Sequence, residues 1–150
     1  MVKIPELKIV QFLEDCEYKS RKSKDPNTKV AAILVDPKSL ADLSTGYNGT
    51  VRGAKERLIP ATSPAKRPYY LHAEVNLLLN CCRLGIKTEG LYLFCSHSPC
   101  SDCARHIYQA GIEVVFFKHF YHRWDEMYPM LDLKHNLIKT PTYNLMVLSQ

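Results

Sequence analysis

The chain has 150 residues, of which 46% are hydrophobic and 23% are charged, and its formal net charge is +5. This composition is typical of a soluble globular protein, and the length suits one domain over residues 1–150 with its own core. We expect an intracellular protein with no membrane contact, because the sequence has neither an apolar run of membrane-spanning length nor a signal-peptide core, and the mild positive charge suits a small anionic ligand better than nucleic acid.

The first elements in chain order are a helix over residues 5–19 and a nearly continuous apolar strand over 29–35. A basic stretch over residues 20–28 joins them, and by charge alone it fits a solvated connector and a cradle for an anionic group equally well. Residues 40–46 form a weaker candidate strand, closed by the turn Gly46-Tyr-Asn-Gly49.

A long segment over residues 50–68 follows, rich in Lys, Arg and Pro, and we expect an irregular loop there. Loops of this length in compact domains are usually functional or disordered. Because this one leads straight into the His72 segment, its functional interpretation is a substrate-covering role. The remaining sequence predicts helices over residues 71–84, 101–110 and 122–133, and strands over 91–95, 114–117 and 143–148.

One motif carries most of the chemical information: His72-Ala-Glu74, completed downstream by Pro99-Cys-Ser-Asp-Cys103. Zn²⁺ prefers nitrogen and thiolate ligands, so His72, Cys100 and Cys103 would supply three ligands and leave one position for water. Glu74 would then be free to move protons. Cys-x-x-Cys alone would also fit a redox pair or half of a structural zinc site, but the upstream His-x-Glu matches the signature of zinc nucleobase deaminases.

The predicted order of strands and helices also places the His72–Cys103 motif where a ligand would bind. Strands over residues 91–95 and 114–117 flank a helix, which predicts a parallel pair. Ligands of open α/β sheets bind at the carboxyl ends of such strands, where Cys100 follows the first strand and His119 and Tyr121 follow the second. The other cysteines, Cys16, Cys81, Cys82 and Cys95, are expected to be reduced buried thiols. A second metal site that uses Cys81, Cys82, Cys95 or His97 stays open, although no second paired motif accompanies them.

The sequence resembles the cytidine deaminase superfamily and, within it, the deoxycytidylate (dCMP) deaminases. The resemblance covers residues 21–122 and rests on five segments: Ser23-Lys-Asp-Pro-Asn-Thr28, Gly46-Tyr-Asn-Gly49, Pro68-Tyr-Tyr-Leu-His-Ala-Glu-Val-Asn76, Ser98-Pro-Cys-Ser-Asp-Cys-Ala104 and Gln109-Ala-Gly-Ile112. One departure is Val51, where members usually have Pro.

The resemblance implies a three-layer α/β/α fold with a mixed five-stranded sheet. It implies zinc-dependent hydrolysis of dCMP to dUMP and ammonia, supplying dUMP for thymidylate synthesis, with Glu74 carrying protons from water to the base. By the same resemblance, the Ala73 N–H would bind the base carbonyl, Asn48 the sugar and Asn27 the sugar or phosphate side, with Tyr121 near the base or sugar. Members often form homohexamers regulated by dCTP and dTTP with Mg²⁺.

Rival functions share the zinc motif. Another cytosine compound could be the substrate, such as dCTP, a modified dCMP or cytidine. An editor of tRNA or single-stranded DNA is disfavoured by the mild charge and by the residues around Asn48. A non-catalytic zinc-binding nucleotide sensor would have no use for Glu74, which favours an enzyme.

Overall fold

Residues 2–121 and 136–148 are described by the structure, a computed structural model. Its main sheet is mixed and has six strands in the order β2-β1-β5-β6-β8-β7. Only β5 and β6 are parallel to each other, which confirms the predicted parallel pair. The strands are β1 (Ala31–Val35), β2 (Asp42–Tyr47), β5 (Tyr92–His97), β6 (Val114–His119), β7 (Leu137–Lys139) and β8 (Asn144–Val147).

The sheet therefore has one strand more than the five implied by the resemblance. The additional strand is β7, a three-residue segment that pairs antiparallel with β8 at the edge of the sheet. So short a segment carries too little periodicity to be recognised in the sequence. The helix predicted over residues 122–133 lies outside the described residues.

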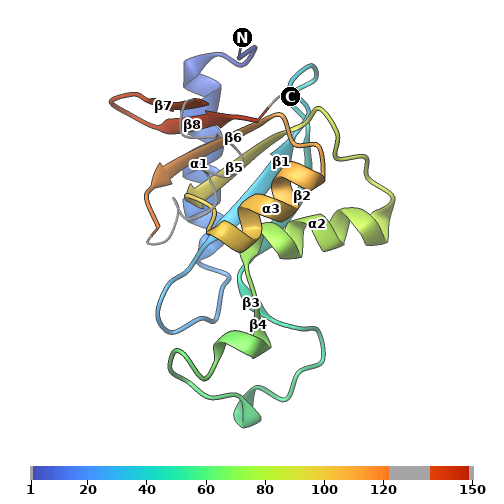
Figure 1. The fold of residues 1–150 in the computed structure, drawn as a ribbon, viewed down its shortest axis with the longest axis vertical. Coiled ribbons are helices and arrows are strands. Elements are labelled where there is room, and N and C mark those ends of the chain that lie inside the picture. Colours follow the sequence, from blue (N-terminus) through green and yellow to red (C-terminus); the bar gives the residue numbers. More distant parts are fainter. Residues whose placement is uncertain (1, 122–135, 149–150) are drawn as a thin grey trace.

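Helices cover both faces of the sheet (Figure 1). Helix α1 (Glu6–Ser20) packs on one face, where its buried Ile9 and Leu13 belong to the same apolar cluster as Phe94. Helices α2 (Ala73–Leu84) and α3 (Ser101–Gln109) belong to the opposite face, in a cluster that includes Leu93. Successive residues of a strand point to opposite faces, so β5 is buried from both sides. The predicted three-layer α/β/α arrangement is confirmed.

The close packing of α2 on the sheet depends on Gly46, which was predicted to end the strand and lies inside β2, one residue before its end. The strand begins two residues later and ends one residue later than predicted. A Cβ atom at Gly46 would lie 2.3 Å from the carbonyl oxygen of Ala73 and 2.5 Å from the backbone nitrogen of Leu77. The first turns of α2 thus rest directly on the backbone of β2, which fixes where this helix begins.

Residues 49–71 are more ordered than the predicted irregular loop. They begin and end in a two-stranded antiparallel ribbon, β3 (Gly49–Thr50) with β4 (Tyr70–Leu71), and contain two 3₁₀ turns, η1 (Glu56–Leu58) and η2 (Arg67–Tyr69). The segment projects away from the main sheet (Figure 1). Because Asn48 precedes β3 and His72 follows β4, the ribbon joins two predicted site residues.

Within residues 2–121 and 136–148, no helix combines the length and apolarity needed to cross a membrane. All six cysteines are described, and none forms a disulfide. Cys16, Cys81 and Cys95 are buried as expected, whereas Cys82 is exposed on the outer face of α2, contrary to the prediction.

Candidate active site

Two helix N-termini present the predicted metal ligands. His72 and Cys100 each occupy the residue immediately before a helix, and their carbonyl oxygens accept the first helical hydrogen bonds, from Asn76 at 2.9 Å and Ala104 at 2.8 Å. Neither side chain caps its own helix. The imidazole of His72 and the thiol of Cys100 are therefore not used as helix caps and are available to bind a metal ion.

These ligands converge with Cys103, in the first turn of α3. The Nδ1 atom of His72 lies 3.4 Å from the Cys100 Sγ atom and 3.3 Å from the Cys103 Sγ atom. In tetrahedral zinc sites with ordinary bond lengths, nitrogen and sulfur ligands lie about 3.6 Å apart. The observed spacing fits a zinc ion with little adjustment. Among the described residues, this is the only group of three His, Cys, Asp or Glu ligand atoms that lie within 4.8 Å of one another.

Proton sharing couples the three ligands. A hydrogen bond from Cys103 lowers the pKa of the Cys100 thiol to about 3, against the opposing effect of burial and with further help from His72. The same thiol–thiolate bond, together with burial, raises the pKa of Cys103. The pKa of His72 is raised, first by its hydrogen bond with Cys100. Zinc requires deprotonated ligands, so its binding would release these shared protons.

Glu74 stands beside the cluster in the first turn of α2. Its side chain is almost fully buried, with 4% of the residue exposed, and its Oε2 atom lies 3.6 Å from the Cys103 Sγ atom. Burial raises the pKa of Glu74 to about 6. General acid–base groups work best when their pKa lies near the operating pH, so this carboxyl group is suited to exchanging protons near neutrality.

Two predicted substrate contacts lie next to the cluster. Ala73 is the buried first residue of α2, and the first N–H groups of a helix have no partner within it. Tyr121 follows β6, is half-buried against the core on the α2 and α3 side, and donates its backbone N–H to the Ser98 hydroxyl at 2.7 Å. Ser98 leads directly into Cys100, so this bond holds Tyr121 beside the ligand segment.

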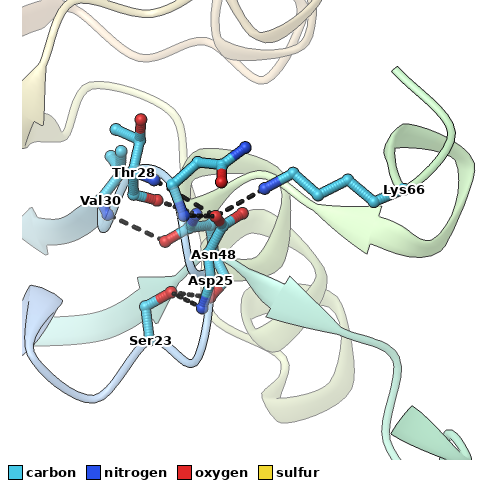
Figure 2. A network of polar contacts seen from close by, with 7 residues as sticks. Ser23, Asp25, Thr28, Val30, Asn48 and Lys66 are labelled. Atoms are coloured by element: carbon cyan, nitrogen blue, oxygen red, sulfur yellow. Dashed lines mark hydrogen bonds and ion pairs between the residues drawn. The ribbon is translucent and has the colours of Figure 1, made fainter. Parts of the chain in front are cut away.

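The other two predicted contacts are Asn27 and Asn48, and they lie in neighbouring segments because Asn48 is hydrogen-bonded to Thr28, the residue after Asn27. Figure 2 shows Asn48 beside Thr28 and Asp25. The Asn48 side chain holds the neighbouring chain: its Oδ1 accepts the Val30 N–H at 2.9 Å and its Nδ2 donates to the Thr28 carbonyl at 2.7 Å. A primary amide has a second N–H and a second lone pair beyond these bonds. Asn27 has an exposed side chain, and its backbone N–H donates to the Asp25 carboxylate at 2.8 Å.

A buried ion pair in this region was missing from the sequence prediction. Lys66 Nζ lies 2.6 Å from Asp25 Oδ1, and only 7% and 8% of the two side chains are exposed. Burial pushes the pKa of Asp25 upward, but hydrogen bonds from Lys66, Asn27 and Thr28 outweigh it and leave the pKa lowered. Asp before Pro26 is typical of a side-chain-stabilised turn, but no local signal marks Lys66 as its partner.

Comparison with known proteins connects this geometry to a family. Residues 8–119 match the family described as "Cytidine and deoxycytidylate deaminase zinc-binding region". Human deoxycytidylate deaminase is 36% identical over 122 residues, spanning 77% of this chain and 67% of the human protein.

Solved structures lead to the same family. The cyanophage S-TIM5 dCMP deaminase in complex with dCMP and dUMP is 32% identical, with a TM-score of 0.75 over 85% of this chain and 93% of the phage chain. Its apo form aligns with a TM-score of 0.69 over 85% and 94% of the two chains. The chain described here belongs to the zinc-binding cytidine and deoxycytidylate deaminase family.

Proposed function

We propose that this chain hydrolyses dCMP to dUMP and ammonia, with zinc held by His72, Cys100 and Cys103. The observation that carries the proposal is the buried Glu74 carboxyl group beside a three-ligand cluster of zinc-site dimensions. A structural zinc site has no need of a buried proton carrier next to its ligands. The likeness to a phage structure that holds dCMP and dUMP supports the choice of substrate and product.

Glu74 carries the protons in the proposed reaction. Zinc, when bound, supplies a water activated for attack at neutral pH. Glu74 accepts the proton of that water, transfers it to N3 of the cytosine ring, and then helps to protonate the departing amine. One water is consumed and one ammonia is released. Burial suits Glu74 to this exchange because it raises the carboxyl pKa to about 6.

We propose that four residues bind the substrate. The Ala73 N–H would bind the base carbonyl at the N-terminus of α2, where free N–H groups favour an acceptor. Tyr121 would lie near the base or sugar. Asn48 would bind the sugar with its second N–H, and Asn27 would serve the sugar or phosphate side. The hydrogen bonds that Asn48 makes to Thr28 and Val30 support this placement, because they keep both asparagines in one structural unit.

A substrate panel tests the proposal: ammonia release from dCMP, CMP, dCTP, deoxycytidine and a short single-stranded DNA. We expect kcat/KM for dCMP to exceed that for deoxycytidine by at least about 100-fold, because a site built for an anion leaves its donors unpaired with a neutral analogue. Faster turnover of deoxycytidine or of the oligonucleotide would overturn the substrate assignment. It would leave the zinc chemistry standing.

We further propose an intracellular homo-oligomer, with a hexamer as the expected assembly, and control by dCTP and dTTP with Mg²⁺. The support is the family resemblance, including the Gly46-Tyr-Asn-Gly49 segment. Sedimentation measures the assembly, and dCMP turnover at added dCTP or dTTP measures the control. A monomer at working concentration would contradict the first part, and rates unaffected by either nucleotide would contradict the second.

A further inference from the structure

Lys66 is unusual because lysine is rarely buried unless it is paired. Its ammonium group contacts Asp25 at 2.6 Å and lies 5.0 Å from the centre of the Tyr70 ring. In the other ion pairs found among the described residues, every side chain is at least 26% exposed. A buried pair loses the hydration of two charges, so it is weak evidence for stability and calls for another explanation.

The Asp25 carboxylate is the centre of a network rather than one end of a pair (Figure 2). The same Oδ1 atom that contacts Lys66 accepts the backbone N–H groups of Asn27 at 2.8 Å and Thr28 at 3.2 Å. Thr28 is in turn held by the amide of Asn48. Lys66 therefore acts on the turn that carries Asn27, through a single carboxylate oxygen.

The position of Lys66 in the chain shows which two segments its ion pair with Asp25 connects. Lys66 immediately precedes η2, and its carbonyl oxygen accepts the N–H of Tyr69, the last residue of η2, at 3.0 Å. Strand β4 follows η2 and leads to His72. On the other side of the ribbon, β3 leads back to Asn48. The ion pair thus joins the turn of residues 25–28 to the segment that ends in the first metal ligand.

We propose that Lys66 is a positioning residue for the substrate: through Asp25 it sets the distance between the Asn27 turn and the metal cluster. This inference rests on the proposed function, in which Asn27 serves the sugar or phosphate side. It differs from a phosphate-binding role for Lys66, because the ammonium group is already paired and enclosed.

The first experiment is Lys66→Met in zinc-loaded protein, with dCMP as substrate. We expect zinc content to stay at the wild-type level and KM to rise about 10- to 100-fold, the scale of a misplaced binding group, while kcat falls much less. Glu56→Gln is the matched control, because it breaks an exposed pair with Lys24 that joins the same two segments. Its KM should stay at the wild-type value. An unchanged KM in Lys66→Met would overturn the proposal.

A second variant separates positioning from folding. Lys66→Met leaves the Asp25 charge buried without its partner, whereas Asp25→Asn with Lys66→Met removes both charges and keeps an acceptor for the Asn27 and Thr28 N–H groups. We expect the double variant to regain the thermal stability lost in Lys66→Met but to keep the raised KM. Return of KM to the wild-type value would show that Lys66 only neutralises a charge, and would overturn the proposal.

Hydrogen exchange gives a readout that needs no substrate. The amides of Asn27 and Thr28 should exchange several-fold faster in both variants than in wild type, because the carboxylate or amide that accepts them is no longer tethered to Lys66. Unchanged exchange would contradict the tether itself. If the wild-type protein failed to deaminate dCMP, the proposed function would fall, and the exchange rates would still decide whether Lys66 fixes this turn.

Discussion

The metal cluster and the Asn27–Asn48 region are built in different ways. Residues of the cluster lie at the N-termini of two helices, α2 and α3, which are packed against a buried sheet. The Asn27–Asn48 region consists of loops, tied together by a carboxylate, an amide and one buried lysine. The chemical centre thus takes its geometry from regular structure, and the substrate side takes its geometry from a few polar contacts.

This difference predicts two kinds of failure. Substitutions in the cluster should abolish turnover, because they remove either the zinc ion or the carboxyl group that transfers protons. Changes in the loop region should leave the metal in place and affect how the substrate is held. Perturbations of the two regions can therefore be told apart by measuring zinc content together with kcat and KM.

Cys100→Ala should have the largest effect. Loss of one of three protein ligands should remove zinc and with it all measurable deamination, and should lower stability, because metal binding is coupled to folding. Elemental analysis and ammonia release provide the measurements. Cys82→Ala is the matched control, since Cys82 is exposed on α2 and should be replaceable without loss of zinc. Full zinc content in Cys100→Ala would remove Cys100 from the ligand set.

Glu74→Gln should leave the cluster intact and stop the chemistry. The amide has the same shape as the carboxyl group but cannot accept the proton, and a positioned acid–base group typically contributes about 10²- to 10⁴-fold. We expect wild-type zinc content and nucleotide binding with kcat reduced by that factor. Turnover near the wild-type rate would exclude Glu74 as the proton carrier.

The same contrast explains what the sequence could predict. The sequence could predict that His72, Glu74, Cys100 and Cys103 belong together, because helix periodicity and short motif spacing are local signals, and the structure brings these four side chains together at two helix N-termini. The helix predicted over residues 5–19 is α1, displaced by one residue, for the same reason. The parallel β5–β6 crossover places α3, with Cys100 and Cys103, on the face of the sheet where α2 packs with His72 and Glu74. The roles of these four residues as zinc ligands and proton carrier stay predictions.

The loop region offered no such signal. Lys66 was one of several basic residues in a segment predicted to be irregular, and its partner lies 41 positions earlier. The ribbon β3–β4 has only two residues in each strand, too few for alternation to show. Gly46 was recognised as a turn residue, but its actual role, contact with the backbone of α2, depends on tertiary packing.

Gly46→Ala should damage the cluster indirectly. The new methyl group would overlap the Ala73 carbonyl and the Leu77 nitrogen, which are backbone atoms, so α2 would have to move. Overpacking of this kind costs about 1–3 kcal/mol in unfolding free energy, and displacement of His72 and Glu74 should also lower kcat. Gly49→Ala is the control, because a Cβ atom there meets nothing within 4 Å. Equal stability of the two variants in denaturant unfolding would contradict the contact.

The smallest expected effect is the acid dependence contributed by the buried pair. Because the pKa of Asp25 is lower in the folded protein than its ordinary value of 3.8, its contribution to stability is fully present above that value. It is lost as the pH falls through the folded-state pKa, by up to about 1.4 kcal/mol per pH unit. The measurement is the unfolding free energy of wild type minus that of the double variant Asp25→Asn, Lys66→Met, from pH 6 to pH 3.

At neutral pH this difference can have either sign, because replacing both members of a buried pair by neutral residues is often tolerated. Its change with pH has only one sign: the wild-type advantage must shrink, or its deficit must grow, as the solution becomes more acidic. Release of zinc in acid affects both proteins through the same three ligands and cancels in the difference. A difference that stayed constant down to pH 3 would show that Asp25 is not held ionised by Lys66 and the turn amides.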